Sequence, residues 1–175
     1  MNNIRAFKNI RPQIPASTYI DPAACVIGDV VIGDDSSVWP MVAVRGDVNS
    51  IRIGNRTNIQ DGSILHVTHQ GPLSPAGNAL TIGSDVTIGH NAVIHACTIE
   101  DECLIGMGSV ILDGAVVGKG AMVGAGSVVA PGKKLVGGHL YLGTPARQAR
   151  ELSQQEKDFL KYSAEHYVKL KNEYM

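Results

Sequence analysis

The chain has 175 residues, about the length of one domain, and its 15 Lys and Arg residues nearly balance 16 Asp and Glu residues. A net charge of -1 excludes the strongly basic surface that binds nucleic acid, and a hydrophobic content of 44% excludes a disordered chain. No apolar leader and no run of eighteen apolar residues is present, so we expect a cytoplasmic protein with neither a nucleic-acid nor a membrane partner.

Small side chains must fill the interior, because 20 glycines accompany an aromatic content of only 5%. The three cysteines, Cys25, Cys97 and Cys103, show no paired spacing. We expect them to be small hydrophobic side chains in a reducing compartment and not a disulfide framework.

An aliphatic residue recurs every six positions along most of the chain. The first run is Ile20, Val26, Ile32, Val38, Val44, then Ile53, Ile59 and Leu65; the second is Ile82, Ile88, Ile94, then Ile99, Ile105, Ile111, Val117, Val123 and Val129. Four residues after the aliphatic the side chain is often small, as at Ala92, Ser109, Ala115, Ala121 and Ser127. Such a unit is a short strand plus a tight corner, and three units form one triangular coil. Stacked coils pair as parallel strands about 4.8 Å apart, so we expect β-helix coils over about residues 17–135.

The period slips by three extra residues between Val44 and Ile53 and by one missing residue between Ile94 and Ile99, and two longer segments depart from the repeat altogether. Residues of about 67–80 are rich in Gly and Pro and have no period, which predicts a loop inserted at one corner. After Pro131-Gly132 the repeat ends, and Ser153 with Glu156 forms a capping box before apolar residues at helical spacing. We therefore expect a C-terminal helix over about 153–174 within a single domain, 1–175.

Two of the six histidines occupy equivalent positions of the repeat. If the loop after Leu65 is an insertion, His66 and His95 follow aliphatic residues on the same face and point outward one coil apart. Arg45 lies in the same outward column. Imidazoles with backbones about 4.8 Å apart can share a metal ion at about 2.0–2.1 Å per bond.

His90 lies at a corner on the preceding face of the same coil. Outward directions on adjacent faces diverge by roughly 120°, so one chain cannot easily direct His90 and His95 to the same ion. A cyclic trimer closes this contact by placing the corner of one subunit against the face of the next. Three histidines with one open position are the ligand set of a catalytic zinc. We therefore expect a homotrimer with intersubunit sites formed by His66, His95 and the neighbour's His90, and surface positions for His139 and His166.

Four segments carry a family signature: Arg45-Gly46-Asp47, Asn58-Ile59-Gln60-Asp61-Gly62, Leu65-His66 and Gly89-His90-Asn91-Ala92-Val93-Ile94-His95-Ala96-Cys97. They resemble the gamma-class carbonic anhydrase family, and more narrowly its bacterial carbonic-anhydrase-like branch, from Ile20 to the terminal helix. The resemblance implies an all-β, left-handed parallel β-helix of hexapeptide repeats with a C-terminal α-helix. It also implies a trimer with a zinc-type ion at each interface, with iron(II) and cobalt(II) as alternatives to zinc.

The resemblance further implies roles for side chains around the metal. Arg45, Asp47 and Asp61 would form interface ion pairs, Gln60 would hydrogen-bond the nucleophilic hydroxide, and Tyr167 matches the family's site tyrosine. From the residues alone, Arg45 and Asp47 also fit a surface ion pair, Asp61 fits a turn, and Tyr167 fits helix packing. Both interpretations stay open at this point.

The chain departs from the fully active archaeal enzymes of this family, which carry an acidic loop with a proton-shuttling glutamate. Segment 66–81 has no Asp or Glu, and Lys169 stands where the family enzymes carry a polar amide. Proton export limits fast hydration, so we expect weak or no turnover unless His69 accepts the proton, since imidazole as a group titrates near neutrality.

These features predict a metal-dependent lyase that interconverts CO2 and bicarbonate by attack of hydroxide. A CoA-dependent acyltransferase, a thioester hydrolase and a non-catalytic, metal-binding trimeric scaffold are the alternatives. Metal content separates them in part, because about one tightly bound ion per chain favours hydration and none favours the transferase.

Overall fold

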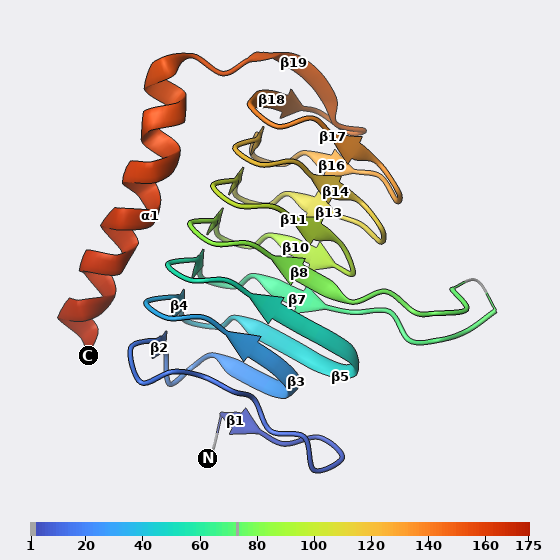
Figure 1. Ribbon diagram of the computed structural model, residues 1–175, viewed down its shortest axis with the longest axis vertical. Helices are drawn as coiled ribbons and strands as arrows, with labels where there is room; N and C mark the ends of the chain where they lie inside the picture. The colour runs from blue at the N-terminus through green and yellow to red at the C-terminus, as the bar shows by residue number, and fades with distance from the viewer. Residues whose placement is uncertain (1–2, 73) are drawn as a thin grey trace.

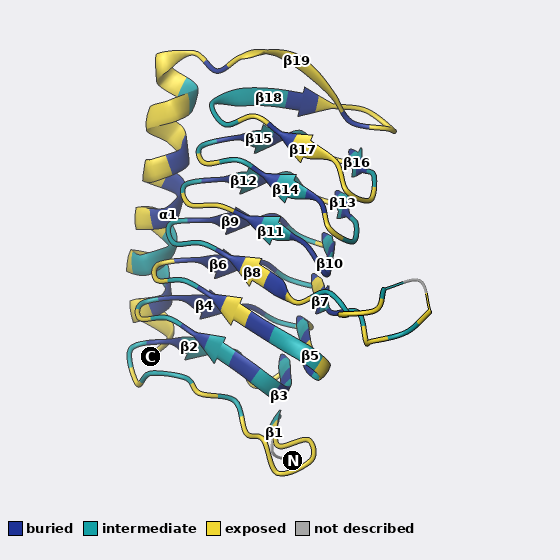
Figure 2. Cartoon of the chain, turned by 45° about the vertical axis from the view of Figure 1, so that its right-hand side comes forward, coloured by how far each residue is buried: buried dark blue, intermediate teal, exposed yellow. Residues whose placement is uncertain are grey.

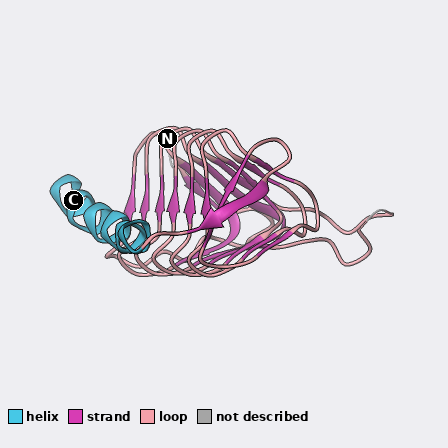
Figure 3. Ribbon diagram, turned by 90° about the horizontal axis from the view of Figure 1, so that it is seen from above, coloured by secondary structure: helices cyan, strands magenta, loops and turns pink. Residues whose placement is uncertain are grey.

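The computed structural model describes residues 3–72 and 74–175 and shows short parallel strands stacked into a three-sided solenoid, with one helix along its side (Figures 1 and 3). The first side contains β1 (Ile4–Arg5), the first halves of β3 (Cys25–Ile32) and β5 (Ala43–Ile53), β7 (Ile64–His66), β10 (Val93–His95), β13 (Val110–Ile111) and β16 (Val128–Val129). The second side contains the second halves of β3 and β5, β8 (Leu80–Ile82), β11 (Thr98–Ile99), β14 (Val116–Val117) and β17 (Lys134–Leu135).

The third side is a separate sheet, and the helix packs against it. Its strands are β2 (Tyr19–Ile20), β4 (Ser37–Val38), β6 (Asn58–Ile59), β9 (Thr87–Ile88), β12 (Leu104–Ile105), β15 (Met122–Val123), β18 (His139–Leu142) and β19 (Arg147–Glu151). The first two sides form one continuous sheet, because β3 and β5 are long enough to run across the corner between them. This arrangement confirms the predicted parallel β-helix with a C-terminal helix.

The hexapeptide register is confirmed by the strand pairing. On the first side the partners run from Val26 through Val44, Leu65 and Ile94 to Ile111, all fully buried. The small side chains at Ala92, Ser109, Ala115, Ala121 and Ser127 are buried as well. Figure 2 shows buried residues alternating with less buried ones along the long strand β3. Each inward aliphatic stacks on its equivalents in the coils above and below, so burial accumulates along the stack.

The coils extend beyond both ends of the predicted 17–135 range. At the N-terminal end β1 pairs with β3, and Gln13 forms a bridge to Val31. At the C-terminal end β18 continues the third side in parallel with β15, and β19 then pairs with β18 in the antiparallel direction. The prediction that the repeat ends at Pro131-Gly132 was therefore wrong. The six-residue spacing continues from Val129 through the inward residues Leu135 and Tyr141, but neither is a β-branched aliphatic and neither is followed by glycine, so the repeat was missed there.

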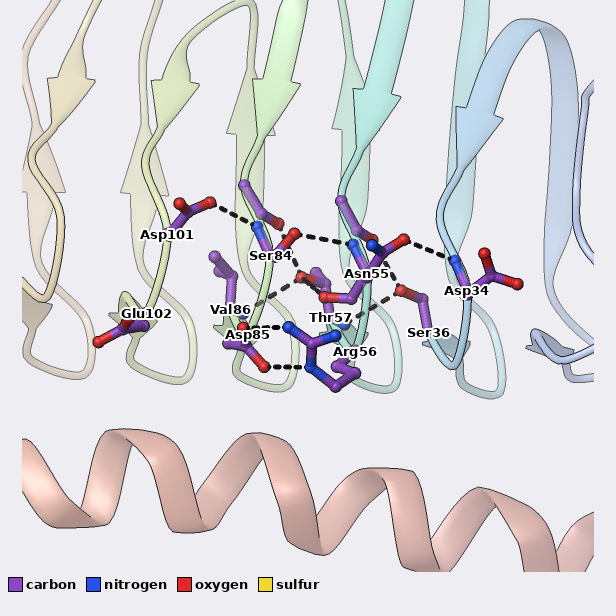
Figure 4. Close-up of polar contacts among 12 residues, drawn as sticks. Asp34, Ser36, Asn55, Arg56, Thr57, Ser84, Asp85, Val86, Asp101 and Glu102 are labelled. Carbon is purple, nitrogen blue, oxygen red and sulfur yellow. Dashed lines mark hydrogen bonds and ion pairs between the residues drawn. The ribbon is translucent and has the colours of Figure 1, made fainter.

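A polar ladder joins successive coils at the corner between the second and third sides (Figure 4). The backbone N–H of Asp34 donates to Asn55 Oδ1 at 2.8 Å, that of Asn55 to Ser84 Oγ at 3.1 Å, and that of Ser84 to Asp101 Oδ1 at 2.8 Å. A Cβ on Gly54 would lie 2.6 Å from the Ser84 backbone nitrogen, so only glycine allows this close approach of the coils.

The predicted loop at about 67–80 lies between β7 and β8 and projects from the solenoid (Figure 1). Its two arms pair at Thr68 and Asn78, and residue 73 lies outside the described residues. Three extra residues between Val44 and Ile53 lengthen β5, and they place Asp47 beside the end of β7.

The terminal helix α1 (Gln154–Tyr174) runs back along the third side from the last coil toward the first (Figure 1). The predicted capping box is confirmed, with Ser153 and Glu156 each hydrogen-bonding the other's backbone N–H. Trp39 packs edge-on against Tyr167 and Tyr174, which fixes the far end of the helix. Within the described part of the chain, no helix combines the length and apolarity needed to cross a membrane.

Thiol reactivity gives a test of the packed interior. Cys25, Cys97 and Cys103 are free, and burial raises the pKa of both Cys97 and Cys103 to about 12. Because only the thiolate reacts, these two thiols stay protonated and unreactive well above neutral pH. We expect a chromogenic disulfide reagent at pH 8 to modify at most one thiol per native chain, at half-buried Cys25, and all three in denaturant. Rapid modification of three thiols in the native protein would contradict this packing.

Candidate metal centre

The two histidines predicted to be neighbours lie in register on the first side of the solenoid. His66 ends β7 and His95 ends β10, and the two residues are direct partners in the parallel ladder. His66 Nδ1 and His95 Nε2 are 3.1 Å apart, and the ring centroids are 5.2 Å apart. The register of the inward Leu65 and Ile94 forces this contact, because each histidine is the next, outward residue.

In each ring the inner nitrogen faces the other histidine, and the outer nitrogen, which faces away from it, contacts an aspartate. His66 Nε2 lies 3.1 Å from Asp47 Oδ1, and His95 Nδ1 lies 2.7 Å from Asp113 Oδ1. A carboxylate only accepts hydrogen bonds, so both contacts favour a proton on the outer nitrogen and a lone pair on the inner one. Without a cation between them, two inner lone pairs at this distance would repel each other.

The spacing and donor chemistry fit a shared zinc-type ion. Two nitrogens bound at about 2.0–2.1 Å to one tetrahedral zinc lie about 3.3 Å from each other. The observed 3.1 Å between His66 Nδ1 and His95 Nε2 is close to that value. The carboxylates behind the rings are the supporting groups that metal-binding histidines use in proteins.

The charges around the rings also suit a cation. Burial lowers the pKa of His66, and the neighbouring Arg45 charge lowers it further, so the ring is neutral at pH 7. Burial alone would raise the pKa of Asp47, but hydrogen bonds from Arg45 and His66 lower it below its usual value. Burial alone would likewise raise the pKa of Asp113, but hydrogen bonds from Thr68 and His95 lower it below its usual value. The neutral His66 imidazole thus lies beside the ionised carboxylate of Asp47.

His90 lies on a different flank, at the turn between β9 and β10, as predicted. Its Nδ1 is 2.9 Å from Asp61 Oδ2, and Asp61 occupies the equivalent turn one coil earlier. Gln60 is buried beside it, with Nε2 donating to Asn58 Oδ1 at 3.1 Å. Tyr167 reaches this flank from α1; burial and the negative charge of Asp61 raise the pKa of its phenol.

A groove of about 550 Å³ opens on this flank between α1 and the third side. His90, Gln60 and Tyr167 lie along it, and Met107, Met122 and Phe159 contribute much of its apolar wall. Met107 and Phe159 are exposed there. The groove therefore combines an apolar body with a few polar groups, which is the usual character of a ligand or contact surface.

The predicted site residues thus form two separate groups. We call Arg45, Asp47, His66, His95 and Asp113 the paired-histidine flank, and Gln60, Asp61, His90 and Tyr167 the His90 flank. In residues 3–72 and 74–175 no single-chain cluster of three or more His, Cys, Asp or Glu side chains has metal-binding geometry. Arg45 is ion-paired with Asp47 within the chain, and Asp61 contacts His90.

Sequence reasoning missed Asp113 and Thr68. Asp113 directly follows Leu112, the column residue one coil after His95, so an acidic residue at that position was the available signal. Thr68 donates its hydroxyl to Asp113 Oδ2, and nothing in the repeat predicts this contact because Thr68 belongs to the inserted loop. A cavity of about 380 Å³ lies at the base of the inserted loop, and Thr68, His69 and Asp113 are among its lining residues.

Comparison with known proteins places this geometry in a family. Residues 96–131 match the family described as "Bacterial transferase hexapeptide (six repeats)", and residues 79–111 match "Hexapeptide repeat of succinyl-transferase". The chain is 53% identical over 172 residues to Protein YrdA of Escherichia coli (strain K12), covering 98% of this chain and 94% of that protein.

Two further relatives extend the comparison. Gamma carbonic anhydrase 1, mitochondrial, of Arabidopsis thaliana is 45% identical over 159 residues, covering 91% of this chain and 58% of that protein. The crystal structure of a hexapeptide transferase family protein from Anaplasma phagocytophilum superposes with a TM-score of 0.90 at 36% identity over 98% of both chains. The chain therefore belongs to the gamma-carbonic-anhydrase-like family of hexapeptide-repeat proteins.

Proposed function

We propose that this protein is a homotrimeric metalloenzyme that hydrates CO2 reversibly to bicarbonate. His66 and His95 of one subunit and His90 of the partner subunit would hold a zinc-type ion between them. The observation that carries the proposal is the contact between His66 Nδ1 and His95 Nε2 at 3.1 Å, with a carboxylate behind each ring. Two ligands do not complete a catalytic zinc site, which takes three protein ligands and leaves one position open.

The two flanks complement each other in charge as well as in ligands. Arg45 and Asp61 leave 47% and 48% of their side chains exposed, on the paired-histidine flank and the His90 flank respectively. In a cyclic trimer each flank meets the other flank of the next subunit, so Arg45 would pair with Asp61 of the partner subunit. This contact would align the third histidine with the other two.

When bound, the metal would supply a water whose pKa is lowered to about 7, and hence a nucleophile at neutral pH. Asp47 and Asp113 keep the imidazoles in the tautomer whose inner nitrogens can act as ligands. The Gln60 amide nitrogen donates a hydrogen bond to Asn58. Its carbonyl oxygen would accept a hydrogen bond from the nucleophilic hydroxyl and so orient it. Arg45 places a positive charge where the anionic product forms.

Proton transfer to solvent is the step for which the chain is least equipped. The loop after β7 offers His69, which is exposed and lines the cavity beside Asp113, in place of an acidic side chain. Imidazole accepts protons near neutral pH, so His69 fits the role of proton acceptor, with slower turnover than an acidic loop supports.

Stopped-flow CO2 hydration tests this function directly. Protein purified without chelators and loaded with zinc, cobalt(II) or, without oxygen, iron(II) is expected to accelerate hydration with at least one metal. Gln60→Ala is expected to lower kcat at unchanged metal content, because it orients the nucleophile without binding the ion. Absence of catalysis with all three metals would exclude the enzymatic proposal and leave a metal-binding trimeric scaffold.

A second candidate is hydrolysis of a thioester, and the groove on the His90 flank favours it. A space of about 550 Å³ with an apolar wall is far larger than CO2 requires and could take an acyl group. The same hydroxide would attack a thioester carbonyl. Acyl-CoA hydrolysis that needs the metal would support this candidate, whereas acyl transfer without any metal would indicate the transferase alternative.

A further inference from the structure

The carboxylate of Asp113 joins a histidine of the first side to the inserted loop. Its Oδ1 lies 2.7 Å from His95 Nδ1, and its Oδ2 accepts a hydrogen bond from the Thr68 hydroxyl. The backbone carbonyl of Asp113 accepts from the Gly132 N–H at 2.8 Å, which fixes the corner after β13. Both carboxylate oxygens therefore have a defined partner, and the carboxylate cannot rotate without losing one of them.

Thr68 is itself held in place at the base of the loop. Its N–H donates to the Asn78 carbonyl at 2.9 Å, and the Asn78 N–H donates back to the Thr68 carbonyl at 3.0 Å. The same Thr68 carbonyl accepts from Asn49 Nδ2 at 3.2 Å. These contacts tie the two arms of the loop together at the residue whose hydroxyl reaches Asp113.

The corresponding support of His66 is built differently. Asp47 contacts His66 Nε2 and is held by Arg45, a charged donor on the same strand. Asp113 is held by a neutral hydroxyl from a loop 45 residues earlier in the sequence. Removing the loop contact should therefore affect His95 and leave the support of His66 in place.

We propose that Asp113 and Thr68 are positioning residues for His95. Asp113 accepts a hydrogen bond from the Nδ1–H of His95 and so fixes the tautomer that directs the Nε2 lone pair toward His66. Thr68, clamped by the base of the loop, fixes the orientation of Asp113. This inference rests on the proposed metal function and assigns the loop a task that needs no acidic side chain.

Cobalt(II) binding to the full-length trimer tests the inference with readouts that do not depend on turnover. The wild type, Asp113→Ala, Thr68→Val, Thr68→Ser and Thr98→Val would be titrated against a competing chelator, and their visible cobalt spectra recorded. Loss of a partner behind a metal-binding histidine typically lowers metal affinity about 10- to 100-fold. We expect a loss in that range for Asp113→Ala and a loss of about tenfold for Thr68→Val.

The other variants make the result specific. Thr68→Ser restores the hydroxyl and is expected to recover wild-type affinity and spectrum, and Thr98→Val on β11 controls for loss of a threonine hydroxyl elsewhere on the solenoid. Trimer mass and thermal unfolding of the metal-free variants show whether each folds. Wild-type affinity and an unchanged spectrum in folded Asp113→Ala and Thr68→Val would overturn the positioning role alone. A wild type that binds no cobalt would overturn the proposed metal function as well.

Discussion

Replacing His90 by alanine is expected to remove the metal ion and CO2 hydration together, although His66 and His95 stay in contact within each chain. Loss of a supporting partner alone costs about 10- to 100-fold in metal affinity, so loss of a direct ligand should exceed about 100-fold. Metal content by mass spectrometry, starting from about one ion per wild-type subunit, and stopped-flow hydration are the measurements. The cause is the separation of the two flanks, which leaves a subunit only two imidazoles on its own face.

His139→Ala is the matched control for this experiment. His139 lies on β18 in the last coil and belongs to neither flank, so its removal should leave metal content and hydration unchanged. A His90→Ala protein with full metal content would show that His90 is not a ligand. The ion would then be held by one subunit, contrary to the intersubunit site.

Replacing Ile82 by alanine is expected to destabilise the folded protein by about 2–5 kcal/mol, which is the usual cost of an Ile→Ala change in a packed core. Ile82 on β8 is 2% exposed and stacks between Ile53 and Ile99 of the adjacent coils. The cavity would interrupt the continuous aliphatic column on which the stack depends. Because whole domains are stable by only about 5–15 kcal/mol, this is a large effect.

Thr81→Ala provides the comparison on the same strand. Thr81 is exposed and points away from the interior, so its removal should change the free energy of unfolding by no more than about 0.5 kcal/mol. Denaturant unfolding of both variants at equal subunit concentration measures the difference, since association contributes to apparent stability. Equal stabilities would contradict the view that the inward column holds the coils together.

The fold was predictable wherever the inward residue is an aliphatic at a six-residue interval. Val26, Val44, Leu65, Ile94 and Ile111 could be aligned once the three extra residues after Val44, the inserted loop after Leu65 and the five-residue step after Ile94 were recognised as slips of the period. The terminal coils were not predictable in this way. β1 precedes Ile20, where the run of repeated aliphatics begins, and β19 pairs in the antiparallel direction, which no repeat pattern indicates.

The candidate site was predictable to the extent that the same register fixes it. His66 and His95 are 29 residues apart, and so are Asp61 and His90, because one coil with its inserted loop separates each pair. The contact between His66 and His95 was predicted, and the same spacing could have predicted the contact between Asp61 and His90. The Thr68 contact depends on how the loop folds back, which is a long-range effect without periodicity.

Mixed trimers test the intersubunit site most directly. A variant with His66→Ala and His95→Ala keeps only the His90 flank, and His90→Ala keeps only the paired-histidine flank, so each trimer alone should be inactive. Unfolding and refolding an equal mixture distributes the two chains at random, and an intact site then needs one chain of each kind in the correct order. The account predicts that about a quarter of the wild-type metal sites and hydration activity return in the mixture. Two inactive variants that form mixed trimers without recovering metal or activity would contradict it.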